Sequence, residues 1–421
     1  MASRCAFGYS RFEMQALHAL IVAGIVAANS AFPSAEQGGS VVRVGNSEEL
    51  RRALQNAPPG TEVLLEPGEY QGGLHFEGLR GSLARPILIR ASDPKSPPRF
   101  VGGGLQFSKV SHLEIRDLAI SGAKTNGLNI DDGGNLRQPS HHVVLRNIRV
   151  SDLPQGNHDG IKLSGIDDFL VADSVVERWG GSGIDMVGCH RGKIVGCTFR
   201  AGGDSGVQAK GGSSEISVVR CRFENPGHRG VNAGGSTGFE YFRPPLSDMP
   251  SNGKYEAKSI TVEGCEFVGG VTPIAFVGVD GAVFRFNTVF EPERWAFRIL
   301  QETREPGFVA SRDGQFESNL IVFRSDRWFS GGVNVGPGTQ PESFRFARNF
   351  WLCSDKPSSS RPQLPTPEIG GTYGLDPGVI DPTKGDVRVR EGSPAQAVGA
   401  HAYRTADETL FSRLVSPTPA K

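Results

Sequence analysis

Short apolar segments recur through the middle of the chain in one pattern. A glycine is followed by an apolar, a polar and a second apolar residue, as in Asp159-Gly160-Ile161-Lys162-Leu163. The residue after the glycine recurs at positions 128, 161, 184, 207 and 231, so the last three intervals are 23, 23 and 24 residues. Such alternation predicts short strands with one buried face. The fixed period predicts a solenoid.

A second apolar strand repeats in step with the first. Its copies lie at 144–148, 170–174, 194–197, 218–221, 260–265, 283–287 and 319–322. The units show no helical pattern, and about 23 residues are too few for a propeller blade. We therefore predict an all-β fold, a single parallel β-helix in which each strand pairs with its equivalent one coil further on, about 4.8 Å away.

The two ends of this solenoid are predicted to be covered. Asn46-Ser47-Glu48-Glu49 has the form of a capping box, and Leu50 and Leu54 follow on one face of a short helix. Such a helix would cover the first coil. We expect residues 32–400 to form one β-helix domain and residues 401–421 to be a loosely ordered tail.

Residues 1–31 are predicted to be a secretory signal peptide. Arg4 and Arg11 precede an apolar run at 16–28, and small residues follow at 29–31. The alternative is an uncleaved membrane anchor, although the run is short for a span. After cleavage no segment is expected to cross a membrane. We therefore expect a secreted or periplasmic protein.

Composition narrows the class of protein. The 421 residues include 45 basic and 45 acidic ones, so no basic excess indicates a nucleic-acid partner. Glycine, at 56 residues, is nearly twice as frequent as usual, as expected for a fold with many turns. The five cysteines after the signal form no disulfide framework. Cys197, Cys221 and Cys265 share one sequence context, which predicts a buried ladder of thiols.

The polar residues of the repeat are expected to stack into a row on the outside of the coil. In chain order the row is Asn129, Lys162, Asp185, Gln208 and Asn232, with Lys210 beside it. The flanking turns add further chemical side chains: Asp159, His158, His190, Arg191, His228 and Arg229. We expect the row to face water and to line a groove. The alternative is an ordinary solvated sheet face with a weak Lys162–Asp185 salt bridge.

From the capping helix through the stacked Gly-Ile-x-Leu turns, the chain resembles the right-handed parallel β-helix (pectin lyase-like) superfamily. Its members include pectate lyases, polygalacturonases and polysaccharide lyase family 6, which contains chondroitinase B and alginate lyases. The resemblance covers nearly the whole mature chain. It implies a right-handed coil and a carbohydrate-active enzyme, whereas the particular activity depends on the site residues.

The polygalacturonase pattern is matched only in part. Asn157-His158-Asp159 is similar to its first motif, but Gly181-Ser182 and Ser205-Gly206 stand where an aspartate pair and His-Gly belong. The family 6 lyase pattern places a base lysine at the end of such a strand, and Lys210 occupies that position. Arg229 follows 19 residues later, slightly before the place of the family's arginine, and Asn232 lies nearer to that place. Gly203 and Ser205 stand where the family's calcium-binding glutamates belong.

These matches favour β-elimination on a uronate polymer. Removal of the C5 proton requires that the neighbouring carboxylate be neutralised and that a base take the proton. We assign Lys210 as the base, with His228 as the rival, and Arg229 and Arg191 as neutralising groups. Gln208 and Asn232 are expected to donate to the enolate. Lys162, Asp185, Asp159, His158 and His190 are expected to bind substrate.

A long aromatic insertion, 239–255, follows the polar row. Tyr241 and Arg243 are its candidate substrate-binding residues, whereas Trp179 and Trp295 are expected to pack internally. Calcium has candidate ligands, but none has EF-hand spacing and no metal site is assigned: Asp131, Asp132, Asp167, Asp168 and Asp204.

The sequence thus predicts a monomeric polysaccharide lyase whose partner is an anionic polysaccharide. A glycoside hydrolase, a C5-epimerase and a non-catalytic carbohydrate-binding solenoid stay open as alternatives.

Overall fold

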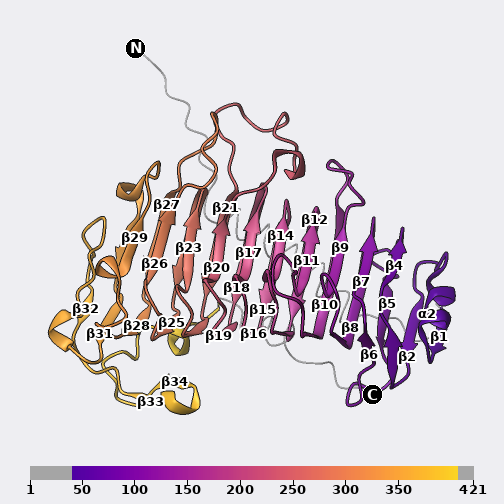
Figure 1. Ribbon diagram of the computed structural model, residues 1–421, viewed down its shortest axis with the longest axis horizontal. Coiled ribbons are helices and arrows are strands. Elements are labelled where there is room, and N and C mark those ends of the chain that lie inside the picture. Colours follow the sequence, from indigo (N-terminus) through magenta and orange to yellow (C-terminus); the bar gives the residue numbers. More distant parts are fainter. Residues whose placement is uncertain (1–39, 406–421) are drawn as a thin grey trace.

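The computed structural model describes residues 40–405, so the predicted signal peptide and residues 406–421 lie outside it. Strands stack along the long axis of the molecule, each paired in parallel with its equivalent in the next coil (Figure 1). The predicted all-β parallel β-helix is confirmed. Among residues 40–405, no helix is long and apolar enough to span a bilayer.

One face of the coil is a 10-stranded sheet that contains the repeated segments in which a glycine is followed by an apolar, a polar and a second apolar residue. Its strands are β4 (Leu74–Glu77), β7 (Leu105–Ser108), β9 (Leu128–Asp131), β11 (Ile161–Ser164), β14 (Ser182–Val187), β17 (Ser205–Lys210), β20 (Arg229–Gly234), β23 (Ile274–Val277), β26 (Phe297–Leu300) and β29 (Val333–Val335).

A 22-stranded sheet bends round the rest of the coil in two rows. Two long strands, β8 (Ser111–Ser121) and β10 (Ser140–Ser151), belong to both rows. The first row otherwise holds β1 (Val41–Val44), β2 (Glu62–Leu65), β5 (Ile87–Ala91), β12 (Ile166–Ala172), β15 (His190–Val195), β18 (Ser213–Val219), β21 (Ala257–Glu263), β24 (Val279–Arg285), β27 (Arg312–Glu317) and β30 (Arg345–Ala347). The second row otherwise holds β3 (Glu69–Gln71), β6 (Arg99–Val101), β13 (Val175–Glu177), β16 (Thr198–Arg200), β19 (Arg222–Glu224), β22 (Glu266–Val268), β25 (Thr288–Phe290), β28 (Leu320–Phe323), β31 (Phe350–Cys353) and β32 (Thr372–Tyr373).

The recurring glycine keeps the coils close together. Gly183 precedes Ile184 in β14, and a Cβ there would lie 2.6 Å from the backbone oxygen of Gly206 in the next coil. A side chain at this position would push the two coils apart. The period read from the sequence is therefore the period of the coil.

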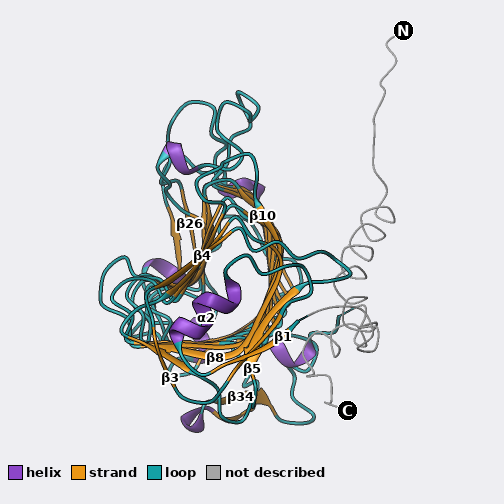
Figure 2. Ribbon diagram, turned by 90° about the vertical axis from the view of Figure 1, so that its right-hand side faces the viewer, coloured by secondary structure: helices purple, strands orange, loops and turns teal. Residues whose placement is uncertain are grey.

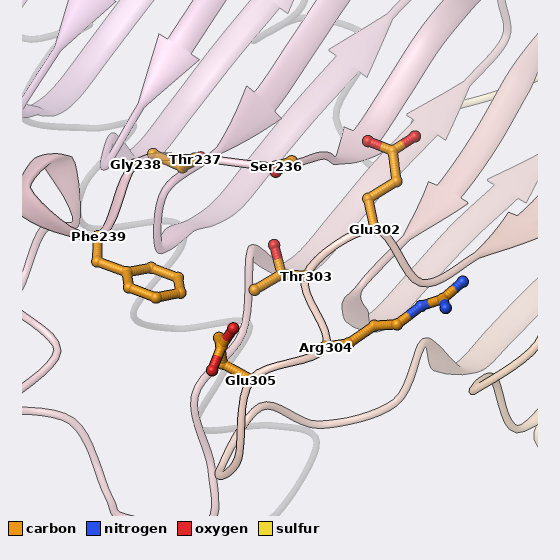
Figure 3. A pocket seen from close by; sticks show the side chains of 8 residues that line it. All are labelled: Ser236, Thr237, Gly238, Phe239, Glu302, Thr303, Arg304 and Glu305. Atoms are coloured by element: carbon orange, nitrogen blue, oxygen red, sulfur yellow. The ribbon is translucent and has the colours of Figure 1, made fainter.

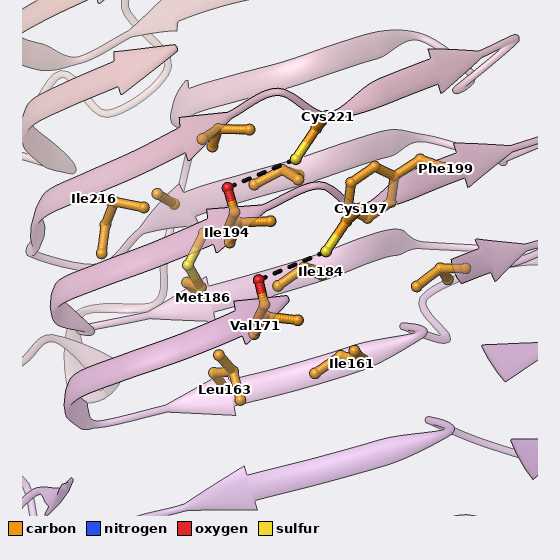
Figure 4. Packing of buried hydrophobic residues seen from close by; sticks show 14 of the residues in the cluster. Ile161, Leu163, Val171, Ile184, Met186, Ile194, Cys197, Phe199, Ile216 and Cys221 are labelled. Carbon is orange, nitrogen blue, oxygen red and sulfur yellow. Dashed lines mark hydrogen bonds between the residues drawn. The ribbon is translucent and has the colours of Figure 1, made fainter. Parts of the chain in front are cut away.

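Apolar side chains and thiols fill the interior as ladders (Figure 4). The rings of Phe199, Phe223 and Phe267 stack on successive coils, with centroids 4.9 and 4.6 Å apart. The Cys197 and Cys221 thiols point inward and donate to backbone oxygens of the preceding coil, at 3.6 Å each. The predicted ladder of thiols is confirmed.

In the coils after Cys265, asparagines take the place of the thiols in this ladder, which we call the turn ladder. The Asn287 side chain accepts from the Cys265 N–H at 2.9 Å. Asn319 accepts from the Asn287 N–H at 2.9 Å, and Asn349 from the Asn319 N–H at 2.9 Å. All three asparagines are fully buried. The ladder satisfies backbone donors that would otherwise be orphaned inside the turns.

A short helix, α2 (Ser47–Leu54), lies across the open end of the first coil (Figure 2). The Asn46 side chain accepts from the Glu49 N–H, and the Glu49 carboxylate accepts from the Gly45 N–H. The predicted capping residues thus cap the helix, although Glu49 accepts from the N–H before the N-cap and from the Asn46 side-chain amide rather than from the Asn46 N–H. Leu50 and Leu54 are both buried, so the predicted cap of the first coil is confirmed.

The chain after the last coil returns along the outside of the molecule. An antiparallel pair, β33 (Val379–Asp381) and β34 (Asp386–Val389), precedes a segment in which the Tyr403 hydroxyl donates to Glu263 Oε2 at 3.0 Å. The packed part of the chain thus extends beyond residue 400, where the loosely ordered tail was predicted to begin. Short 3₁₀ turns occur at η1 (Phe239–Tyr241), η2 (Ser330–Gly332), η3 (Pro341–Ser343), η4 (Pro357–Ser359), η5 (Pro382–Lys384) and η6 (Ala400–Ala402).

Candidate active site

The polar residues of the repeat are in register, as predicted. Lys162 in β11 lies between Asn129 in β9 and Asp185 in β14. Asp185 pairs with Gln208 in β17, which pairs with Asn232 in β20. Residues about 23 positions apart in sequence are therefore lateral neighbours on one sheet.

The expectation that this row faces water is wrong for three of its members. Asp185, Gln208 and Asn232 are 1%, 8% and 0% exposed, whereas Lys162 is partly exposed. The chain that leaves β20 turns back over the row. A Cβ on Gly235 would lie 2.8 Å from Gln208 Nε2 and 3.6 Å from Asn232 Nδ2. This bend covers Gln208 and Asn232, and Lys162 lies against Asp185, so this part of the row is not the floor of an open groove.

Lys162 joins two buried carboxylates. Its Nζ lies 3.4 Å from Asp159 Oδ2 and forms a close ion pair with Asp185 Oδ2. Burial, followed by the charge of Asp185, raises the pKa of Asp159. Burial works against the Lys162 ammonium, but Asp185 and Asp159 outweigh it and raise its pKa. The three groups form one charged cluster inside the sheet face rather than free substrate ligands.

Lys210 lies apart from the cations expected beside it. Its Nζ is 3.6 Å from Asp185 Oδ1 and 3.3 Å from Gln208 Oε1. Arg229 pairs in register with Ser205, at the opposite end of β17, about 16 Å away along the strand. Arg191 is held by Asp167 at 2.9 Å and Asp168 at 2.8 Å, on the other sheet. The histidine and arginines expected to activate Lys210 therefore lie elsewhere, and the cation beside it is Lys162, which shares Asp185 with it.

The insertion after β20 is anchored by buried carboxylates. Arg243 Nε and Nη2 donate to the two oxygens of Asp132 at 2.7 and 2.9 Å, and Nη1 donates to the Tyr241 oxygen at 2.8 Å. Glu256 accepts from Gly211, from Thr237 and from Thr303. Arg243 thus fixes the insertion in place, while Tyr241 remains exposed on it.

Two predicted histidines lie away from one another. His190 Nδ1 is 2.9 Å from Ser214 Oγ, and burial lowers its pKa. His158 lies on the turn before β11, where its backbone oxygen accepts from the Gly181 N–H. His190 shares the outer corner of the 22-stranded sheet with Arg191. His190 and Arg191 thus lie apart from the row of the other sheet.

His228 and Arg229 lie together at a pocket of about 330 Å³. His228 is largely exposed, and its Nδ1 lies 3.2 Å from Asp204 Oδ1. Arg229 Nη2 donates to Glu302 Oε1 at 2.7 Å. The complete lining is Asp204, His228, Arg229, Val271, Glu293, Arg294, Trp295 and Arg298. Hereafter we call this the arginine pocket.

Arg298 brings positive charge to the same pocket. Its guanidinium carbon lies 4.6 Å from the centre of the Trp295 ring, and its Nε donates to Asn334 at 3.0 Å. Burial, followed by the charge of Arg229, lowers the pKa of Arg298. The two guanidinium groups repel each other in this partly buried pocket. An anionic ligand bound there would relieve the repulsion.

A second pocket, of about 320 Å³, lies between the start of the insertion and the 302–305 segment (Figure 3). Its lining is Ser236, Thr237, Gly238, Phe239, Glu302, Thr303, Arg304 and Glu305. Glu302 belongs to this pocket and Arg229 to the arginine pocket, so the Arg229–Glu302 ion pair lies between the two.

The aspartates proposed for calcium already have partners. Asp132 pairs with Arg243, Asp168 with Arg191, and Asp204 with His228. Asp131 accepts from Asn129 and from Gly133. As arranged, these carboxylates do not converge on a calcium ion, which takes six to eight oxygen ligands.

Comparisons with known proteins agree on the fold. A family model described as "Right handed beta helix region" matches residues 103–244. No curated protein matches the sequence. The protein is a right-handed parallel β-helix. A family PL6 polysaccharide lyase from Pseudopedobacter saltans is 14% identical, with a TM-score of 0.52 over 86% of this chain and 99% of that one.

Two further structures share the β-helix at similar distance. A rhamnogalacturonan lyase is 14% identical, with a TM-score of 0.52 over 90% of this chain and 99% of that one. A GH136 lacto-N-biosidase from Eubacterium ramulus is 13% identical, with a TM-score of 0.50 over 79% of this chain and 66% of that one. At such identity the likeness shows the fold alone.

Sequence reasoning missed half of the arginine pocket. Arg298 pairs with Ala275, which pairs with Asn232, so it belongs to the same row two coils further on. Its segment Phe297-Arg298-Ile299-Leu300 has the apolar alternation but not the preceding glycine. Extending the row by register rather than by the glycine would have found it. Trp179 is buried as predicted, whereas Trp295 both packs and lines the pocket.

Proposed function

We propose that this β-helix protein binds an anionic, uronate-containing polysaccharide and cleaves it by β-elimination in the arginine pocket. The observation that carries the proposal is the gathering of Arg229, Arg294 and Arg298 round one pocket with an exposed imidazole, His228. Guanidinium groups match carboxylates in charge and geometry. An aromatic ring, Trp295, completes the lining.

The chemistry follows from this arrangement. A sugar carboxylate among the guanidinium groups loses much of its repulsion toward negative charge, so the adjacent C5 proton becomes more acidic. His228 takes that proton, and Asp204 orients the imidazole from its Nδ1 side. The C5–H electron pair forms the C4–C5 double bond as the C4–O bond breaks. The leaving oxygen takes a proton from water, and His228 later releases the C5 proton to the solvent. This assigns the base to His228 rather than to Lys210.

We propose that Lys210 and the second pocket, between residues 236–239 and 302–305, bind further sugars of the polymer. Lys210 is partly exposed at the end of β17. We propose that it and the exposed Tyr241 contact sugars beyond the cleaved bond. Hydrolysis is the second candidate, because the carboxylates of Asp204 and Glu293 line the same pocket. C5-epimerisation starts with the same proton removal but returns the proton to the other face.

A screen on alginate, pectate and glycosaminoglycans tests the proposal. A lyase yields unsaturated, ultraviolet-absorbing ends, a hydrolase yields reducing ends without them, and an epimerase yields neither but changes the uronate composition. On the cleaved polymer, His228→Ala and Arg298→Gln should each lower kcat by roughly 100- to 1,000-fold.

Arg312→Gln removes a comparable guanidinium on the opposite sheet and should leave the rate unchanged. Full turnover in the His228→Ala variant, with loss in Lys210→Ala, would return the base to Lys210. Binding of the polymer without formation of any product would show that the protein is a non-catalytic carbohydrate-binding solenoid.

We also propose that the protein is exported, since its polymeric substrate lies outside the cytoplasm. We propose separately that it is a monomer. N-terminal sequencing of the mature protein should find cleavage near residue 31, and light scattering should give the mass of one chain. An intact N-terminus in the membrane fraction would favour the anchor.

A further inference from the structure

Three histidines converge on the outside of the β-helix, far in sequence from the arginine pocket. Among the described residues 40–405, His112, His141 and His142 form the one group of three or more His, Cys, Asp or Glu side chains whose ligand atoms converge. One nitrogen from each ring lies within 4.8 Å of the other two. All three side chains are partly exposed, so an ion from solvent can reach them.

The coil brings these rings together. His141 in β10 pairs in register with Ser111 in β8, so His142 lies beside His112 in the adjacent coil. The His112 and His142 rings are stacked with centroids 4.4 Å apart, and the His141 ring stands edge-on to both. The Nδ1 atoms of His141 and His142 are 2.9 Å apart.

These distances suit a first-row transition metal. Bonds of about 2.0–2.1 Å place two tetrahedral ligand nitrogens roughly 3.3 Å apart. The ligand atoms, all within 4.8 Å of one another, would therefore have to draw together by no more than about 1.5 Å to hold an ion. Imidazole nitrogens select zinc, copper or nickel over calcium and magnesium, which prefer oxygen.

The backbone does not itself explain the cluster. His112 and His142 have φ of 48° and 55°, but Asp168 and Arg191 adopt the same conformation at the same corner of the next two coils. The left-handed corner is thus a feature of the coil. What distinguishes the first two of these corners is the imidazole chemistry they carry.

A carboxylate beside the cluster supplies independent support. Asp167 pairs in register with His141, and one of its oxygens accepts from Arg191 at 2.9 Å. The other, Oδ1, is buried without a hydrogen-bond partner. Histidines that bind metals commonly donate their second N–H to such a carboxylate, which fixes the tautomer.

We propose that His112, His141 and His142 bind one divalent transition-metal ion of the zinc class, which clamps the coils of β8 and β10 together. Three protein ligands leave a fourth position for water. The site lies on the 22-stranded sheet, whereas the arginine pocket borders the other sheet. The proposal therefore does not depend on the proposed function.

Titration calorimetry of the full-length, metal-free protein with zinc chloride tests the site. We expect one zinc ion to bind and, because the ion binds the folded state, the Tm to rise with zinc concentration. His112→Asn/His142→Asn removes two ligands while asparagine tolerates the left-handed backbone. Since loss of even an outer partner of a ligand costs about 10- to 100-fold, this variant should bind zinc at least roughly 100-fold more weakly and should lose the Tm shift.

His75→Asn is the matched control, because it removes a histidine from β4 on the other sheet. It should bind zinc as the parent does. The proposal is overturned if the parent binds no zinc, or if the double variant binds it as tightly as the parent.

X-ray absorption at the zinc edge tests the site without any variant. Three imidazole ligands on the bound ion support the proposal. Thiolate ligation, or oxygen ligation alone, overturns it.

Discussion

Asp159 is buried beside Asp185, and this burial links stability to pH. Burial and the charge of Asp185 raise the pKa of Asp159 in the folded protein. An unfolded aspartate titrates near about 3.9. In the interval between these two pKa values, the folded chain holds a proton that the unfolded chain has released. Stability from Asp159 is thus fully present below about pH 4 and is lost as pH rises through the folded pKa.

Asp159→Asn removes this titration while keeping an acceptor for the Ser182 N–H. We expect the free energy of unfolding of the parent, relative to this variant, to fall as pH rises above about 4 and then to level off. Urea unfolding between pH 4 and 8 measures it. Asp152→Asn is the control, because Arg178 lowers the pKa of Asp152 to about 2, so its contribution changes only below about pH 4 and the difference from the parent should stay flat between pH 4 and 8. A difference between parent and Asp159→Asn that rises with pH contradicts the argument.

At this scale the sequence predicted which residues are neighbours but not which are exposed. The register of Lys162, Asp185 and Gln208 follows from the period, because equivalent positions of successive coils must stack. Exposure depends on the non-periodic chain around Gly235, which no repeat describes. The His112 cluster was missed for a similar reason. Its histidines lie some 30 residues apart, in coils whose lengths the glycine pattern did not define.

Elements of the β-helix are held together by ladders that pass from coil to coil. In the turn ladder, thiols occupy the middle coils and asparagines the later ones. Asn319 both accepts from the Asn287 N–H and donates to the Phe284 oxygen at 3.0 Å. The sequence predicted the thiol part from its shared context. The asparagine part stands in the same strand repeat, but its change of residue type concealed it.

Asn319→Ala should be strongly destabilising, because it leaves a buried N–H and a buried carbonyl without partners. At about 1–3 kcal/mol for each group, the expected loss is roughly 2–6 kcal/mol. Asn319→Cys places there the residue used in earlier coils and should restore part of the loss. Chemical denaturation measures both.

Asn252→Ala, on the exposed part of the insertion, should change stability by less than about 0.5 kcal/mol. If Asn319→Ala were equally mild, water or a rearranged turn would have to satisfy the freed groups.

As a whole, the molecule is a row of coils that mainly contact their neighbours (Figure 1). In such a structure stability is nearly a sum of local terms, and an end can open without the rest. The α2 cap protects the first coil, and Leu50 is its buried anchor. The architecture and this cap were predictable because repetition and capping are local signals. The return of the chain to Tyr403 was not, since its contact with Glu263 spans 140 residues.

Leu50→Ala should cost about 2–5 kcal/mol locally. We expect hydrogen exchange to accelerate in β1, β2 and β5, while β26 and β28 keep their protection. Arg51→Ala on the exposed face of α2 is the control and should leave every coil unchanged. Uniform loss of protection along the whole axis would show that the β-helix unfolds as one unit.

The buried thiols have a practical consequence. All five described cysteines are free and buried, and burial raises the pKa of Cys189 to about 12. Because only a thiolate reacts readily, an alkylating reagent can modify each one only while its stretch of chain is open to solvent. Cys189, Cys197, Cys221, Cys265 and Cys353 succeed one another from the middle toward the far end. The relative rates at which these five cysteines are alkylated would therefore show which part of the β-helix opens to solvent first.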